Sequence, residues 1–192
     1  IFLIYGLFIG SFLNVCVYRI PSGISIIKPP SSCGTCGHKL NFFMDMLPVI
    51  NYIRNKGRCR YCGAPYSVQY PLIELLNGIL YVLLYLKYGL TINTALYCLT
   101  VSLLLVISLI DLKHKIIPDG LIITGLVLGI IFIISGGMFF NRLTGAAIGL
   151  LLFLGIALVT NAMGGGDIKL MAVLGLIFCV KGILFITLFS FV

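Results

Sequence analysis

Acidic residues are scarce in this 192-residue chain: Asp and Glu together number 5, charged residues make up 9%, and tryptophan is absent. Ordinary soluble domains carry about 25% charged residues, so the composition excludes that class. Hydrophobic residues reach 60%, and apolar stretches of membrane-spanning length recur. The short alternating segments of a transmembrane β-barrel are not seen. We therefore predict an all-α fold, a polytopic transmembrane bundle of six or more helices in the lipid bilayer.

Six hydrophobic segments and the start of a seventh are predicted, at residues 1–18, 71–89, 92–112, 119–136, 142–163, 168–180 and from about 182. No small-residue cleavage site follows the first segment, so it is interpreted as a transmembrane helix and not as a signal peptide. The chain begins without Met and stops inside an apolar run, so we expect a trimmed piece of a longer protein. The predicted division is 1–18 as first helix, 19–70 as a polar loop, and 71–192 as the main transmembrane domain.

Membrane orientation is predicted from the distribution of Lys and Arg. If the 19–70 loop is cytoplasmic, the turns 113–118 and 164–169 lie on the same side, because two crossings separate each from the last. Ten of the 13 basic residues then lie inside, and three lie outside: Lys87, Arg142 and Lys181. This orientation and the anionic inner leaflet account for much of the net charge of +8, so no nucleic acid is expected as a partner.

Two aspartates lie at helix ends on this predicted cytoplasmic side. Asp111 closes the third segment, and Asp167 follows the glycine triplet Gly164, Gly165 and Gly166. Ionisable groups at membrane depth mark functional sites by default. Two carboxylates in contact cannot both ionise, so one serves as an acid and the other as a base, as an aspartyl protease requires. The bare glycine backbone would accept a substrate strand, and the helix dipole favours the ionised form of Asp167.

Each aspartate also has a plain structural interpretation. Asp167 would be a helix N-cap, and Asp111 would pair with Lys115 one helical turn further on. Glu74, near the start of the second segment, would either contact substrate or cofactor or stabilise a helix dipole. Asn14 is expected to form interhelical hydrogen bonds. Close helix packing is expected at the glycines numbered 125, 129, 145, 149 and 155.

Four cysteines in the polar loop form two C-x2-C pairs, Cys33 with Cys36 and Cys59 with Cys62. Two such turns complete a tetrahedral thiolate site, so a structural zinc is predicted there, with nearby Lys39, Arg58 and Arg60 favouring the thiolates. The alternatives are two disulfides or a redox dithiol, which a reducing cytoplasm disfavours. His38 would either supplement the metal or be an exposed loop histidine, which we favour. The remaining cysteines, Cys16, Cys98 and Cys179, are interpreted as small packing residues.

Several motifs resemble a known family. Gly164–Asp167 fits the GxGD signature of intramembrane aspartyl proteases. Together with Asp111 followed by Ile117-Pro118-Asp119, it resembles the type IV prepilin peptidase family. Similar matches are Gly10–Val15 with Tyr18–Pro21, and Gly57–Gly63 leading into Tyr70–Glu74. The resemblance spans nearly the whole chain, with the motifs in order.

The resemblance implies that Asp111 and Asp167 are the catalytic pair and that Asp119 is not part of it. It also implies cleavage of prepilin and pseudopilin leaders at the cytoplasmic face of the bacterial inner membrane. Methylation of the new N-terminus by S-adenosylmethionine accompanies the cysteine loop in this family, but no motif locates the methyl-donor site. The alternatives are a peptidase without methylation, or a membrane transporter or metal-binding scaffold.

Overall fold

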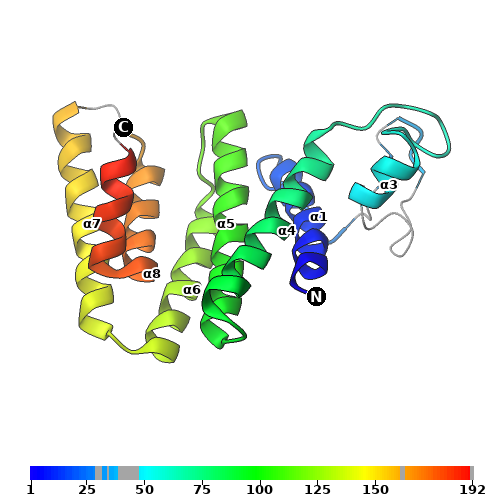
Figure 1. The fold of residues 1–192 in the computed structure, drawn as a ribbon. Coiled ribbons are helices and arrows are strands. Elements are labelled where there is room, and N and C mark those ends of the chain that lie inside the picture. The colour runs from blue at the N-terminus through cyan, green and yellow to red at the C-terminus, as the bar shows by residue number, and fades with distance from the viewer. Residues whose placement is uncertain (29–31, 34, 39–47, 161–162, 191–192) are drawn as a thin grey trace. The chain divides into compact units, whose positions relative to one another are not determined.

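The structure is a computed structural model that describes residues 1–28, 32–33, 35–38, 48–160 and 163–190, with backbone only at 48, 50 and 51. Its helices are α1 (Phe2–Arg19), α3 (Pro48–Arg54), α4 (Gln69–Tyr88), α5 (Ile92–His114), α6 (Asp119–Gly136), α7 (Phe139–Thr160) and α8 (Gly165–Ser190) (Figure 1). All except α3 are long and apolar enough to cross a membrane. The all-α membrane fold is therefore confirmed, whereas α3 was not predicted. Lys39 and Gly34 lie outside the described residues.

The chain divides into two compact units, Ile1–His114 and Lys115–Val192, and each is described by itself. In the first unit, α1, α4 and α5 pack against one another, and α3 packs on α4. In the second unit, α8 packs against both α7 and α6.

Helices α1 and α4 approach so closely that their backbones touch at two glycines. A methyl group built on Gly10 would come within 2.6 Å of the Cα of Glu74, and one on Gly6 within 2.6 Å of the Cα of Gly78. Lipid-exposed helices gain little hydrophobic free energy by associating, so small residues that allow close contact matter most. This contact fixes the register of α1 on α4.

Buried polar side chains then tie the three membrane helices of the first unit together. The Asn77 Nδ2 donates to the Gly6 carbonyl at 2.8 Å, and the Ser102 hydroxyl donates to the Asn77 Oδ1 at 3.0 Å. The Tyr81 hydroxyl lies 2.9 Å from the same serine oxygen. Away from water, such groups stabilise the fold only when they are paired, and these are.

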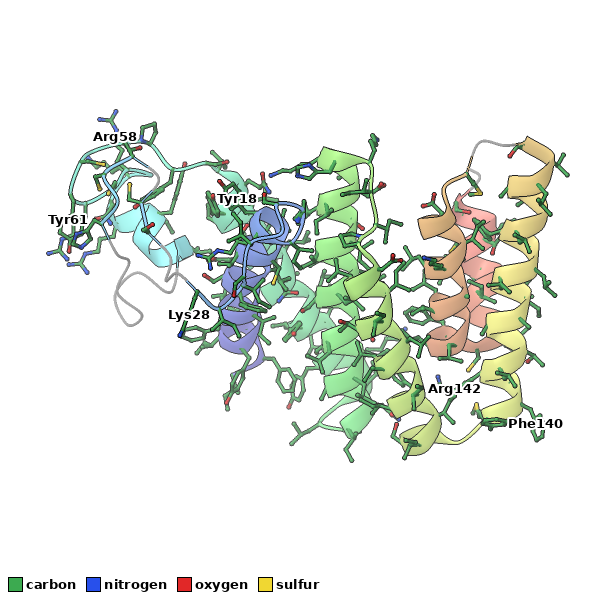
Figure 2. All side chains as sticks on the ribbon, turned by 180° about the vertical axis from the view of Figure 1, so that it is seen from behind. Tyr18, Lys28, Arg58, Tyr61, Phe140 and Arg142 are labelled. Atoms are coloured by element: carbon green, nitrogen blue, oxygen red, sulfur yellow. The ribbon has the colours of Figure 1, made fainter. Side chains whose placement is uncertain are left out.

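Helix α8 is a hairpin of two half-helices. Its backbone leaves the helical conformation at Cys179, where φ is 61° and ψ is −176°. A methyl group on Gly149 of α7 would lie 2.5 Å from the Met171 carbonyl oxygen and 3.3 Å from the Ile183 side chain. A straight helix would separate residues 171 and 183 by about 18 Å, so the chain must reverse between them. The two halves run side by side along α7 (Figures 1 and 2).

Helix α8 contains both the sixth and the seventh predicted segments. The reversal at Cys179 confirms the predicted break between them. Cys179, interpreted as a small packing residue, is half-buried and lies at the turn itself, with a positive φ of 61° that residues with side chains rarely adopt. Cys16 and Cys98 are buried, as expected.

Arg142 satisfies the backbone at this turn. Its Nη1 donates to the carbonyls of Leu176 at 3.2 Å and Ile177 at 2.7 Å, and its guanidinium lies 5.2 Å from the centre of the Phe132 ring. Those carbonyls lose their helical partners where α8 breaks. The prediction places Arg142 on the outer face of the membrane, which the structure does not test. The structure adds that its side chain is buried and caps the turn (Figure 2).

The predicted glycine packing is confirmed at three of the α6 and α7 positions. Gly129 contacts the Leu176 side chain, while Gly145 and Gly149 contact the α8 backbone. Gly155 does not show this packing within its own unit, because it is exposed and an added methyl group there would meet none of the described residues within 4 Å. Gly149 and Gly155 of α7 therefore differ in their packing, since Gly149 contacts α8 and Gly155 does not.

Gly149→Ala should destabilise the protein, because its methyl group would lie 2.5 Å from a backbone oxygen of α8. We expect a loss of about 1 to 3 kcal/mol in the free energy of unfolding. Gly155→Ala is the matched control and should be neutral or slightly stabilising, since alanine favours the helix. Thermal unfolding in detergent would compare the two, and equal midpoints would contradict the packing of α7 on α8.

Candidate functional site

Asp167 lies in the first turn of α8 and not at its N-cap position, since the helix begins at Gly165. The side chain is half-buried, and its backbone N–H donates to the Gly164 carbonyl at 3.2 Å. The position favours a negative charge, because the free N–H groups of a helix start point toward it. The helix start therefore fits the predicted acidic site.

The three glycines before Asp167 differ in their surroundings. Among the described residues, a methyl group on Gly165 would meet nothing within 4 Å, and one on Gly164 would meet only the Asp167 carboxylate, at 3.5 Å. Gly166 instead packs against the side chain of Ile117, at 3.1 Å from the position of an added methyl group. The open backbone available to a substrate strand is thus that of Gly164 and Gly165.

The segment that begins α6 is attached to the start of α8 within the second unit. Besides the contact of Ile117 with Gly166, the Lys169 ammonium donates to the Asp119 carboxylate at 2.7 Å. Both side chains of this ion pair are exposed, by 57% and 71%, so it contributes little to stability. The ion pair gives a structural role to Asp119, which the sequence analysis did not include in the catalytic pair.

Asp111 lies in the last turn of α5, in the first unit, and is half-buried. The proposed pairing with Lys115 does not form, because the helix ends at His114 and Lys115 adopts a positive φ of 56°. In the described part of the chain, the one ion pair is that of Lys169 with Asp119. Asp111 and Asp167 belong to different units, so their pairing is a proposal taken up below.

The four loop cysteines come together as the sequence predicts. Their sulfur atoms all lie within 4.8 Å of one another, and the Sγ atoms of Cys33 and Cys62 are 3.8 Å apart. A tetrahedron with metal–sulfur bonds of about 2.3 Å has sulfur–sulfur edges of about 3.8 Å. All four are free thiols, so the disulfide alternative does not occur. The cluster could hold a metal ion.

Two matching turns present these sulfurs. The N–H of Gly37 donates to the Cys33 carbonyl at 2.9 Å, and the N–H of Gly63 donates to the Cys59 carbonyl at 2.9 Å. Both glycines have a positive φ, 68° and 71°, which explains why a glycine follows each C-x2-C pair. The turns are thus built alike, as expected for a pair of metal knuckles.

Hydrogen bonds and burial shift the pKa values of two cluster cysteines in opposite directions. The pKa of Cys59 falls to about 6, chiefly because the Tyr66 side chain hydrogen-bonds its sulfur, with help from backbone N–H groups. At Cys62 the hydrogen bond from the Ala64 N–H is the largest single effect and lowers the pKa. Burial and the neighbouring thiols together outweigh it and raise the pKa to about 11. A bound metal would displace the remaining thiol protons. Sequence reasoning named nearby basic residues for this effect and missed Tyr66.

His38 is exposed and stacks on the ring of Tyr61, with 3.6 Å between ring centres. It thereby joins the two cysteine turns through an aromatic contact, at the loop where Figure 2 labels Tyr61 and Arg58. The interpretation as a loop histidine, with four cysteines making up the cluster, fits this arrangement.

Glu74 is the polar residue whose position differs most from expectation. It lies beyond the first turn of α4, so the helix-dipole interpretation was wrong, and its side chain is fully buried. Its Oε2 accepts from the Val49 N–H of α3 at 3.1 Å. Asn14 forms the predicted interhelical bond, since its Nδ2 donates to the Tyr70 carbonyl at 3.2 Å.

Comparison with known proteins gives consistent matches. Residues 4–88 match the family described as Bacterial Peptidase A24 N-terminal domain, and residues 98–192 match the Type IV leader peptidase family. No solved structure matches.

Three relatives carry the name prepilin leader peptidase/N-methyltransferase. The protein of Myxococcus xanthus is 39% identical over 135 residues, 70% of this chain and 40% of that protein. That of Pseudomonas putida is 33% identical over 150 residues, 67% of this chain and 52% of that protein. That of Klebsiella pneumoniae is 38% identical over 138 residues, 68% of this chain and 59% of that protein. The chain thus spans about half the length of these relatives. From the two family matches and these relatives, the chain, a multi-pass membrane protein, belongs to the type IV leader peptidase family.

Proposed function

We propose that this chain forms part of an enzyme that cleaves the leaders of type IV prepilins and pseudopilins at the cytoplasmic face of the bacterial inner membrane. In a second step the enzyme methylates the new N-terminal amine. The observation that carries the proposal is the start of α8, where Asp167 follows glycines with open backbone. The relatives' names support both steps. Since the chain covers about half of each relative, both are proposed for the whole protein.

The catalytic pair in this proposal is Asp111 with Asp167. Asp111 precedes Ile117 by only six residues, and Ile117 packs against Gly166 at the start of α8. The segment that follows Asp111 is thus attached to the helix that carries Asp167. This connection, and the absence of a Lys115 partner for Asp111 in the described residues, support the dyad.

The chemistry follows from two carboxylates that share one proton. The ionised partner takes a proton from water as the water attacks the scissile carbonyl carbon. The protonated partner donates to the carbonyl oxygen, and a proton is then delivered to the departing amine. Its first-turn position makes Asp167 the better candidate for the base.

The substrate would lie as an extended strand along Gly164 and Gly165, whose backbone is open. Extended peptides bind through main-chain hydrogen bonds, and a side chain at either glycine would obstruct them. Gly166 does not take part in this contact, because Ile117 covers it. We therefore assign substrate binding to the first two glycines of the triplet.

The metal in the loop would be zinc, held by Cys33, Cys36, Cys59 and Cys62. Four thiolates at tetrahedral spacing suit zinc and leave no open coordination position, so the ion would be structural. It would cross-link two turns of a loop that has little apolar core of its own. The methyl donor would be S-adenosylmethionine, which supplies an electrophilic methyl group to the amine.

Replacing either catalytic aspartate should abolish leader cleavage. Asp111→Asn and Asp167→Asn each remove a carboxylate but keep the side-chain size, and we expect cleavage to slow by a factor of about 100 to 10,000. The measurement is the mobility shift of prepilin incubated with purified full-length protein.

Asp119→Asn is the matched control, because it makes the same change at an exposed ion pair. It should cleave at nearly the wild-type rate. Cleavage by Asp111→Asn or Asp167→Asn at a rate comparable with this control would contradict the dyad, provided that all three proteins unfold at similar temperatures.

Metal analysis of the purified protein should find about one zinc ion per chain. Cys59→Ser should lose most of it, since three thiolates bind zinc far more weakly than four in this geometry. Cys16→Ser, which alters a buried cysteine of α1 outside the cluster, should keep the full amount. Equal zinc in the two variants, or none in the wild type, would show that the cluster is not a zinc site.

A further inference from the structure

Two buried oxygen atoms on the α1–α4 seam have no hydrogen-bond partner among the residues that the structure describes. They are the Oε1 of Glu74, whose side chain is fully buried, and the Oδ1 of Asn14, whose side chain is 6% exposed. A buried acceptor without a donor is costly, so these two oxygens call for a donor that the described residues do not supply.

The orientation of Asn14 is determined by its own hydrogen bonds. Its Nδ2 donates to the Gly10 carbonyl at 3.3 Å and to the Tyr70 carbonyl at 3.2 Å, so the other amide atom must be the oxygen. Gly10 packs directly on Glu74, while Asn14 and Tyr70, which are hydrogen-bonded to each other, each lie one helical turn away from that contact. The two unpartnered oxygens therefore belong to adjacent turns of the seam.

The carboxylate of Glu74 is held in place but is not neutralised. Its Oε2 accepts from the Val49 N–H of α3, and the side chain of Ser11 also interacts with it. The groups known to face it, from α1 and from α3, are uncharged. The nearest cation along α1, Arg19, instead donates to the Ser25 carbonyl at 3.0 Å. In the described part of the chain, no ion pair involves Glu74.

A primary ammonium group meets the needs of such a site. It carries one positive charge for the carboxylate, and its three N–H donors suffice for both free oxygens. If the proposed function holds, leader cleavage creates such a group as the new N-terminus, which is also the group to be methylated. Among the elements shown to contact Glu74, α3 is the one outside the membrane helices, so the amine would arrive from the loop side.

We propose that Glu74 and Asn14 bind the N-terminal amine of the cleaved substrate and that Glu74 takes its proton before methyl transfer. An ammonium has no lone pair and cannot attack a methyl group. Once a proton has passed to Glu74, the nitrogen lone pair forms the new N–C bond. The bond from that carbon to the sulfonium sulfur of the methyl donor breaks, and its electron pair stays on sulfur. This inference rests on the proposed function.

The test separates methylation from cleavage by supplying a substrate that is already cleaved and has a free N-terminus. Glu74→Gln keeps the size of the side chain and an oxygen for the Val49 N–H, but it cannot accept the proton. We expect methylation near pH 6.5 to slow at least 100-fold, as for loss of a general base, while prepilin cleavage stays within about twofold of wild type. Mass spectrometry of the product N-terminus measures the methyl group.

The pH profile distinguishes a base from a merely structural residue. A free α-amine loses its proton with a pKa of about 7.7 to 8.0, so above pH 8.5 it is mostly neutral without help. The Glu74→Gln enzyme should therefore recover toward the wild-type methylation rate as the pH rises. A defect of the same size at every pH, or methylation at the wild-type rate near pH 6.5, would overturn the proposal. Asp119→Asn controls for loss of an acid elsewhere.

A binding measurement on the wild-type protein needs neither a variant nor the methyl donor. A fluorescent peptide with the mature N-terminal sequence should bind at least tenfold more tightly with a free amine than with an acetylated one, and Glu74→Gln should abolish the difference. If the wild-type protein binds the free-amine and acetylated peptides equally, the amine site is refuted, and Glu74 and Asn14 hold only a water or a shared proton. If wild type neither cleaves nor methylates, the proposed function itself fails.

Discussion

Close contact between helix backbones is the constraint on which the rest of this structure depends. Helices surrounded by lipid gain little from burying apolar side chains against one another, so they associate where backbones can touch. In the first unit this happens at Gly6 and Gly10 on α1, and in the second at Gly145 and Gly149 on α7. Each contact sets a register, and the register decides which polar groups meet. The hydrogen bonds of Asn77 and Arg142 exist because these backbones lie so close.

Buried polar groups in the two units fall into two kinds. The first kind is paired within the protein and links helices to one another. Asn77 pairs with Ser102 in this way, and Arg142 pairs with two backbone carbonyls of α8. A side chain of the second kind is buried yet keeps one atom unpaired among the described residues, as in Glu74 and Asn14. Arg142 also has an unpaired Nε, but its remaining bonds explain the residue structurally. Among the described residues, only the Glu74 seam combines a buried carboxylate with a second unpaired acceptor one helical turn away.

The cysteine loop is connected to this seam through short contacts. Tyr52 of α3 packs on Gly57, just ahead of the second cysteine turn, and the Val49 N–H at the start of α3 reaches Glu74. A metal that orders the cysteine turns would therefore also order α3 and the carboxylate beneath it. A structural metal in the cysteine cluster would thus affect the chemistry at Glu74 by ordering α3, although the metal itself would not take part in the reaction.

The sequence by itself determined the membrane helices, the break near residue 180, the cysteine cluster and the aspartates beside helix ends. Each of these depends on local pattern: apolar length, C-x2-C spacing, and glycine or proline at a boundary. Only the tertiary structure showed that Arg142 caps the α8 turn and that Cys179 lies at this turn. Only the tertiary structure showed, for the described residues, that no helix packs on Gly155 and that one oxygen of the buried Glu74 is unpaired. Those properties depend on which side chains from distant segments meet, and no local pattern encodes that.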